Sequence, residues 1–256
     1  MIIDCITFGG ELDMLEGRLN SVEADIHLIV EDELMYANQP KGYLLEDNWD
    51  RFKDFHEKII YKQIKSLGSS NAWSNDYHQR SQLTEMIHHL PMDGNDVVTV
   101  CDTDEWFEKD KIENIDGLVA LNMPKYHMSL HWYHKHELTG IAGRWKNLYG
   151  QDLNNVRWQR EGMKAVTNGW HLTSMGSLEY LIRKVRGFAH QELVFDELDK
   201  ELEHCWTYGH DLQRVGGTVF TEIELKDANF PSWITDRKFP SEWYRKRPVD
   251  SNSNSE

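Results

Sequence analysis

The sequence contains few cysteines, no long apolar run and a deficit of basic side chains. Cys5, Cys101 and Cys205 lie far apart without CxxC spacing, so neither a disulfide framework nor a thiolate zinc site is indicated, which suits a reducing cytosol. No stretch approaches 18 consecutive apolar residues and the first residues lack a basic region followed by an apolar one, so we expect no membrane span and no secretion signal. The 28 basic residues are outnumbered by 43 acidic ones, and the formal charge of −15 disfavours nucleic acid as a partner.

The length of 256 residues favours a single α/β domain, since such domains commonly reach about 250 residues. A chain of this size buries enough surface to fold without a disulfide or a structural metal, so any bound metal is expected to be functional. We expect the domain to span residues 1–248 and the Ser- and Asn-rich segment 249–256 to be a disordered tail.

Short β-prone runs alternate with helical spacing of apolar residues along the first hundred positions. Strands are expected at 2–8, 26–30, 58–64 and 96–101, and helices at 12–19 and 76–90. This alternation indicates a mostly parallel central sheet. Beyond about residue 117 the chain becomes rich in Trp, Tyr and His, which is typical of a ligand-facing surface, and helical spacing returns at 178–185 and 193–205.

Two aspartates, Asp102 and Asp104, directly follow the apolar strand predicted at 96–101. Ligands bind beyond the carboxyl ends of parallel strands, and residues i and i+2 of an extended chain point to the same side. The two carboxylates are therefore expected to converge. Such oxygen ligands suit Mg²⁺ or Mn²⁺, which would share its other positions with water and a substrate diphosphate. The alternative is an Asp pair that caps a helix beginning near Lys109.

Other nucleotide-binding motifs are missing from the sequence. It has no GxxxxGK[ST] loop and no GxGxxG after the first strand, which argues against a kinase, an NTPase and a dehydrogenase. An α/β sheet with a DxD motif at a strand end and an aromatic-rich second half is the layout of a sugar-nucleotide transferase. Aromatic faces stack against the apolar faces of sugars.

Seven strings, in order, resemble glycosyltransferase family 17. They are DCITFGGELDMLEGRLNSV, IVED, QPKG, WSNDYHQRSQL, CDTDE, NGWHLTSMG and KVRGFAHQEL, between about residues 2 and 195. The resemblance implies a GT-A fold, which is a Rossmann-type nucleotide-sugar-binding fold, and inverting transfer from a UDP-sugar, usually UDP-GlcNAc, with Mn²⁺ or Mg²⁺. We expect residues 1–122 to bind the donor and residues 123–248 to supply the acceptor side.

The animal members of this family carry a membrane anchor and stem, and no such segment is present in this sequence. We therefore expect a cytoplasmic N-acetylglucosaminyltransferase from a bacterium or from a virus-infected cell. Its acceptor would be a glycan or another hydroxyl compound.

The resemblance also implies roles for the donor-side residues. Asp102 and Asp104 would hold the metal-diphosphate. Lys41 and Arg80 would neutralise the diphosphate, with Arg80 gripping it through both guanidinium arms, unless they are solvated surface cations.

Three further acids are expected on the nucleotide side. Glu31 would hydrogen-bond the uridine, and Glu11 and Asp13 lie on the neighbouring first loop. The alternative for all three is a favourable charge at a helix N-terminus.

His171 and His190 are candidates for the third metal ligand, since both lie in matching strings and a neutral imidazole binds such ions. We slightly favour His190, and a hydrogen-bonded structural histidine is the alternative for each. Trp170 is expected to pack on a sugar or in the core.

Inversion needs a carboxylate base at the acceptor hydroxyl. Glu192 and Glu179 are candidates because they lie in or near the carboxyl-terminal matching strings, although either could be an exposed helix acid.

Two other functions would use the same features. A metal-dependent nucleotide-sugar hydrolase or phosphotransferase would activate water with the Asp pair and turn over the donor without an acceptor. A non-catalytic carbohydrate-binding module would bind sugars without using the Asp pair.

Overall fold

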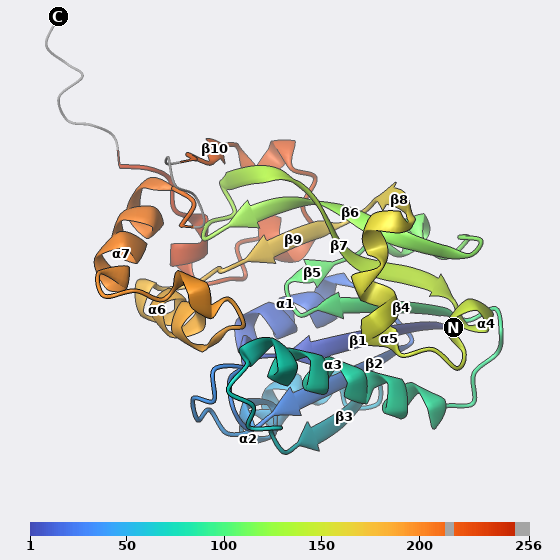
Figure 1. The fold of residues 1–256 in the computed structure, drawn as a ribbon. Helices are drawn as coiled ribbons and strands as arrows, with labels where there is room; N and C mark the ends of the chain where they lie inside the picture. Colours follow the sequence, from blue (N-terminus) through green and yellow to red (C-terminus); the bar gives the residue numbers. More distant parts are fainter. Residues whose placement is uncertain (213–217, 249–256) are drawn as a thin grey trace, which may run out of the picture.

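The four strands predicted in the first hundred residues form one half of a single mixed sheet. The structure is a computed structural model that describes residues 1–212 and 218–248, and the tail predicted at 249–256 lies outside the described residues. Figure 1 shows one α/β domain whose curled sheet carries helices on both faces.

The sheet has ten strands in the described part of the chain. They are β1 (Ile2–Phe8), β2 (Ile26–Asp32), β3 (Ile59–Ile64), β4 (Val97–Asp102), β5 (Glu105–Trp106), β6 (Leu118–His127), β7 (Trp132–Arg144), β8 (Lys164–Thr167), β9 (Trp170–Thr173) and β10 (Thr221–Glu222). The α-helices are α1 (Leu12–Ser21), α2 (Leu44–Asp47), α3 (Ala72–His88), α4 (Trp145–Leu148), α5 (Leu153–Trp158), α6 (Leu178–Gly187), α7 (Leu198–Tyr208) and α8 (Ser232–Thr235). Short 3-10 helices span Trp49–Phe55, Lys109–Lys111, Arg160–Gly162, Gln191–Leu193, Leu225–Asp227 and Ser241–Tyr244.

All six elements predicted before residue 102 are present; β1 has the predicted bounds, and the other five differ from the prediction at one or both ends. The helices predicted at 178–185 and 193–205 correspond to α6 and to α7, which begins later than predicted. The predicted division between residues 122 and 123 falls inside strand β6.

The strand order is β3-β2-β1-β4-β7-β6-β9-β5, with β8 beside β6 and β10 beside β7. Strands β1 to β4 pair in parallel. In contrast, β7 is antiparallel to both β4 and β6, and β5 is antiparallel to β9. The prediction of a mostly parallel sheet is therefore wrong. The short loop at 128–131 joins β6 to β7, and a connection this short joins only antiparallel strands.

Strand β1 is buried on both faces, which explains its continuous apolar character. Ile3 and Cys5 pack in a cluster with Leu83 of α3, whereas Ile6 packs on the opposite side with Leu15 of α1. This alternation is the period-2 pattern of a strand. It leaves Asp4 on the α1 side of the sheet.

The carboxylate of Asp4 and the guanidinium of Arg18 form a fully buried ion pair between β1 and α1. Arg18 donates from Nε and Nη2 to the two oxygens of Asp4 at 2.9 and 2.7 Å. His27 Nδ1 lies 3.0 Å from the same carboxylate, and Thr99 donates to it at 2.9 Å. Burial would raise the pKa of Asp4, but Arg18 and His27 hold it well below its usual range.

The remaining arm of Arg18 fixes the turn after β4. Its Nη1 donates to the backbone carbonyls of Asp102, Thr103 and Glu105. The acidic turn is thus held by hydrogen bonds from the Arg18 guanidinium, which has no contact with solvent.

The structure also shows the state of the cysteines and the character of the helices. All three cysteines are buried as free thiols. Among residues 1–212 and 218–248, no helix is both long and apolar enough to cross a bilayer.

The buried pair yields a stability prediction. Replacing Arg18→Met leaves the buried carboxylate of Asp4 without its guanidinium partner, with only His27 and Thr99 beside it, so we expect the free energy of unfolding in urea to fall by about 3–5 kcal/mol. Arg51→Met is the control, because Arg51 pairs with Asp13 and Glu16 at the partly exposed surface, where such pairs contribute less than about 1 kcal/mol. Equal losses in both variants would contradict an anchoring role for Arg18.

Candidate active site

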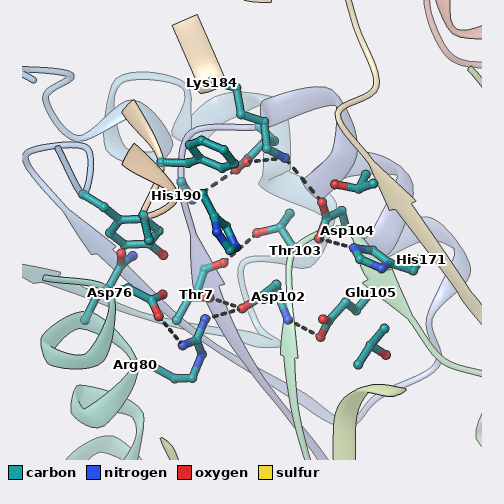
Figure 2. A pocket seen from close by; sticks show the side chains of 18 of the residues that line it. Thr7, Asp76, Arg80, Asp102, Thr103, Asp104, Glu105, His171, Lys184 and His190 are labelled. Carbon is teal, nitrogen blue, oxygen red and sulfur yellow. Dashed lines mark hydrogen bonds and ion pairs between the residues drawn. The ribbon is translucent and has the colours of Figure 1, made fainter. Parts of the chain in front are cut away.

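A cleft of about 460 Å³ opens beyond the carboxyl ends of β1 and β4. Its walls come from the loops after β1 and β2, from α3, α5 and α6, and from β6, β7 and β9. Figure 2 shows that Arg80, Asp102, Asp104, His171 and Lys184 point toward this one space. The cleft lies where ligands bind in parallel α/β sheets.

Both oxygens of the Asp102 carboxylate are already occupied by protein donors. Oδ1 accepts from Thr7 Oγ1 and Arg80 Nη2, each at 2.8 Å, and Oδ2 accepts from Arg157 Nη2 at 2.8 Å. Burial would raise the pKa of Asp102, but Arg157 and Arg80 hold it far below its usual range. Asp102 is therefore an anion shared by two arginines.

Arg157 and Glu105 were not identified from the sequence. Arg157, on the short helix α5, also pairs with Glu105 Oε1 at 2.7 Å. The other oxygen of Glu105 accepts from the backbone N–H of Asp102 at 2.8 Å. This closed ring of contacts fixes the geometry of the turn, and the only sequence signal for it was the acidic string that contains Glu105.

Asp104 is held quite differently from Asp102. Its Oδ2 lies 3.4 Å from Lys184 Nζ, and the same ammonium lies 3.4 Å from Glu11 Oε1. Burial would lower the pKa of Lys184, but Tyr180, Asp104 and Glu11 raise it well above its usual value. Lys184 therefore stays charged between two carboxylates. Lys184 is the first residue of the string KVRGFAHQEL that resembles the family, but its role was not identified from the sequence, because the helical spacing of α6 does not mark which side chain reaches the acidic turn.

His171 faces the second oxygen of Asp104 across 3.8 Å, from Nε2 to Oδ1. Its other ring nitrogen lies 3.5 Å from Glu137, and contact with His171 holds the pKa of Glu137 well below its usual range. Strand β9 reaches this position through Gly169, whose φ is +62°. A Cβ there would lie 1.8 Å from the carbonyl oxygen of Trp106, so only glycine allows β9 to pair with β5.

The residues present fit a divalent ion at Asp104 but not at Asp102. Within the described ranges, no three His, Cys, Asp or Glu side chains cluster as a complete protein site. Mg²⁺, however, is usually bound through one or two carboxylates and completes its shell with water and substrate phosphate. Asp104 offers one such carboxylate, His171 could add an imidazole nitrogen, and Glu137 stands where the outer partner of a metal-binding histidine is usually found.

The charges that line the cleft differ from those of the whole chain. Six Lys or Arg and six Asp or Glu side chains line it, whereas acidic residues outnumber basic ones 43 to 28 in the sequence. Basic groups are therefore concentrated here, and this compensates part of the field that would repel an anionic ligand.

Aromatic side chains form the mouth of the cleft. Trp73 contacts Trp158 and His190 edge to face, with ring centroids 6.0 and 4.6 Å apart. Both tryptophans line the cleft and are partly exposed. His190 pairs with Glu192 at 2.6 Å, and no contact joins it to either aspartate of the turn in the described structure. It lies at the rim, beside the aromatic groups.

Glu31 and Lys41 form a buried ion pair with each other, and Glu31 does not line the cleft. Glu31 is fully buried and accepts from Lys41 Nζ, from Tyr61 and from the backbone N–H groups of Leu44 and Leu45 at the start of α2. The bonds of Glu31 to the first N–H groups of α2 match the alternative of a charge at a helix N-terminus. Lys41 borders the cleft, but its side chain is only 1% exposed.

Four other predicted residues lie away from this cleft. Trp170 packs in the core and donates to the carbonyl of Ala228, so core packing describes it. Glu179 and Glu192 are exposed acids that line neither the cleft nor the second cavity described below. Asp13 pairs with Arg51 beside a second cavity.

Comparison with known protein families identifies the chain. The sequence model of glycosyltransferase family 17 matches residues 1–221. The chain belongs to glycosyltransferase family 17. A comparison with curated proteins gave no match. Family membership makes the cleft of this glycosyltransferase the expected site for a nucleotide-sugar donor and its acceptor.

The contrast between the two aspartates predicts different effects on stability. Asp102→Asn would leave Arg80 and Arg157 without their shared counter-charge, so we expect unfolding free energy to fall by about 1–3 kcal/mol. Asp104→Asn should lower it by less, because the contacts of its carboxylate with Lys184 and His171, at 3.4 and 3.8 Å, are longer than the 2.8 Å contacts of Asp102 with Arg80 and Arg157. Thermal and urea unfolding measure both. A larger loss for Asp104→Asn would contradict the assignment of Asp102 as the structural member.

Proposed function

We propose that this chain is an inverting, metal-dependent transferase that moves a sugar from a UDP-sugar to a hydroxyl of a glycan or other acceptor. One observation carries the proposal. In the acidic turn, Asp104 faces the cleft with His171 opposite one oxygen and is not locked by arginines. The GT-A type of fold, inversion and GlcNAc as the sugar rest on the family resemblance.

In this proposal, Asp104 and His171 hold Mn²⁺ or Mg²⁺, and Glu137 orients the imidazole. The ion would supply positive charge to the leaving diphosphate. Lys184 lies within 3.4 Å of Asp104 and adds a second positive charge at the same end of the cleft. The balanced charge of the cleft supports binding of an anion there.

Asp102 has a different part in this proposal. Its carboxylate forms ion pairs with Arg80 and Arg157, and these ion pairs keep the turn in place. At the mouth, Trp73 and Trp158 offer aromatic faces to the uracil ring or to a sugar.

The decisive test is calorimetric titration of UDP and UDP-GlcNAc with and without Mn²⁺. We expect metal-dependent UDP binding that is lost in Asp104→Asn. Glu137→Gln should weaken Mn²⁺ binding about 10- to 100-fold, because it removes the carboxylate behind His171. Glu203→Gln is a matched control, since this exposed acid of α7 lines neither cavity.

Other outcomes separate the remaining functions. If UDP is released from UDP-GlcNAc as fast without an acceptor as with one, the hydrolase or phosphotransferase is favoured. Sugar binding that survives Asp104→Asn, with no UDP binding under any metal condition, would favour a carbohydrate-binding module and refute the proposal.

A further inference from the structure

One of the six cations that line the cleft, Arg160, differs from the others in its partners. Arg160 has no carboxylate within 4 Å among the residues that the structure describes. The other five are all paired with acids: Lys41 with Glu31, Arg80 with Asp76 and Asp102, Lys125 with Glu137, Arg157 with Asp102 and Glu105, and Lys184 with Glu11 and Asp104.

We infer that the cleft takes a substrate that carries an anionic group besides the donor diphosphate, a carboxylate or a phosphate, and that Arg160 binds this group. With GlcNAc as the transferred sugar, which is neutral, the group belongs to the acceptor. The inference rests on the proposed transferase function and narrows its substrate class.

The guanidinium of Arg160 is held in place by neutral groups. Its Nε donates to the carbonyl oxygen of Leu138 on β7 at 3.0 Å, and its Nη1 donates to the carbonyl oxygen of Arg157 at 3.3 Å. Its central carbon lies 5.6 Å from the ring centre of Trp158. Nη2 donates no hydrogen bond within the described ranges and is not buried. The guanidinium is therefore oriented before a ligand binds, which reduces the entropy lost on binding.

The surroundings of Arg160 disfavour its positive charge when no anion is bound. The side chain is half-buried, and burial together with the charge of Arg157 lowers the pKa of Arg160 below its usual value. Burial would also lower the pKa of Arg80 and of Arg157, but the acids beside these two raise it. An anion in contact with Arg160 would supply the missing counter-charge. A guanidinium binds carboxylate and phosphate oxygens through strong, charge-assisted hydrogen bonds.

Arg160 and Lys184 belong to different walls of the cleft. Lys184 reaches Asp104 from α6, at the end where the proposal places the diphosphate. Arg160 follows α5 and contacts β7. The charges that act most strongly on Arg160 include those of Arg157 and Asp102, and not those of Lys184 and Asp104. We therefore expect the anion at Arg160 to be a group other than the diphosphate.

A second cavity, of about 300 Å³, adjoins the cleft, because Glu11, Asp104 and Lys184 line both spaces. Its two basic residues, Arg51 and Lys184, are both paired with acids. Among the described residues that line either space, Arg160 is thus the one cation without an acid partner. This difference singles it out as the residue for an anionic group.

The inference is tested with matched neutral and acidic probes. The acceptor arm compares glucose with glucuronic acid and glucose 6-phosphate, by saturation-transfer NMR on the protein loaded with Mn²⁺ and UDP. We expect the acidic probes to bind about 10-fold or more tightly than glucose, as for a hydrogen bond to a charged group. Arg160→Gln should abolish this preference and leave the Kd for UDP unchanged. Arg160→Lys, which keeps the charge without the planar fork, should retain part of it.

The matched control is Arg186→Gln. Arg186 lies on α6, pairs with Asp199 at the surface and lines neither cavity, so its replacement should leave the preference intact. The donor arm compares UDP-glucuronic acid with UDP-glucose. A preference for UDP-glucuronic acid that is lost in Arg160→Gln would assign the anionic group to the transferred sugar instead of the acceptor.

Three results would overturn the inference. They are equal affinity for neutral and acidic probes in both arms, a preference that survives Arg160→Gln, and a loss of UDP binding in Arg160→Gln as large as in Asp104→Asn, which would place Arg160 at the diphosphate. UDP binding by the wild type tests the transferase function separately. If the wild type binds no UDP, the sugar probes alone, compared between the wild type and Arg160→Gln, still decide whether Arg160 binds an anion.

Discussion

The buried ion pair between Asp4 and Arg18 is the interaction on which the site depends. It joins the first strand to the first helix, and its free guanidinium arm holds three carbonyl groups of the acidic turn. Hydrogen bonds are stronger in a dry interior, and a missing partner is costly there. The position of the turn is thus set by the core, while the two aspartates it presents remain at the edge of the cleft.

The sequence predicted the parallel half of the fold because its strands are short β-prone runs, two of which, β1 and β3, are followed by the helical spacing of α1 and α3. It did not predict the antiparallel half. β6 and β7 mix polar, aromatic and apolar residues, and Pro124 interrupts the pattern of β6, so no regular period marks them as strands. The acidic turn was placed correctly at a strand end, whereas Arg157 and Lys184 reach it from helices far along the chain, and such contacts leave no local pattern.

Residue type alone also did not distinguish side chains that bind a ligand from side chains that stabilise the fold. Glu31 and Lys41 lie in strings that resemble the family, yet their charges neutralise each other in a buried pair that fixes the start of a short helix. Asp102 and Asp104 differ by two positions but have opposite environments, one locked by arginines and the other loosely held. The choice and distance of the charged partners decide these roles, and both depend on the tertiary structure.

Lys184 lines both the cleft and the second cavity of about 300 Å³, and its ammonium lies 3.4 Å from Glu11 and from Asp104, which line both spaces as well. A ligand that draws this ammonium to one side changes the electrostatic potential on the other side. Thermodynamic linkage makes such an effect reciprocal, so that each ligand alters the affinity for the other by the same factor. The charge of this one side chain therefore contributes to the electrostatic potential of both spaces.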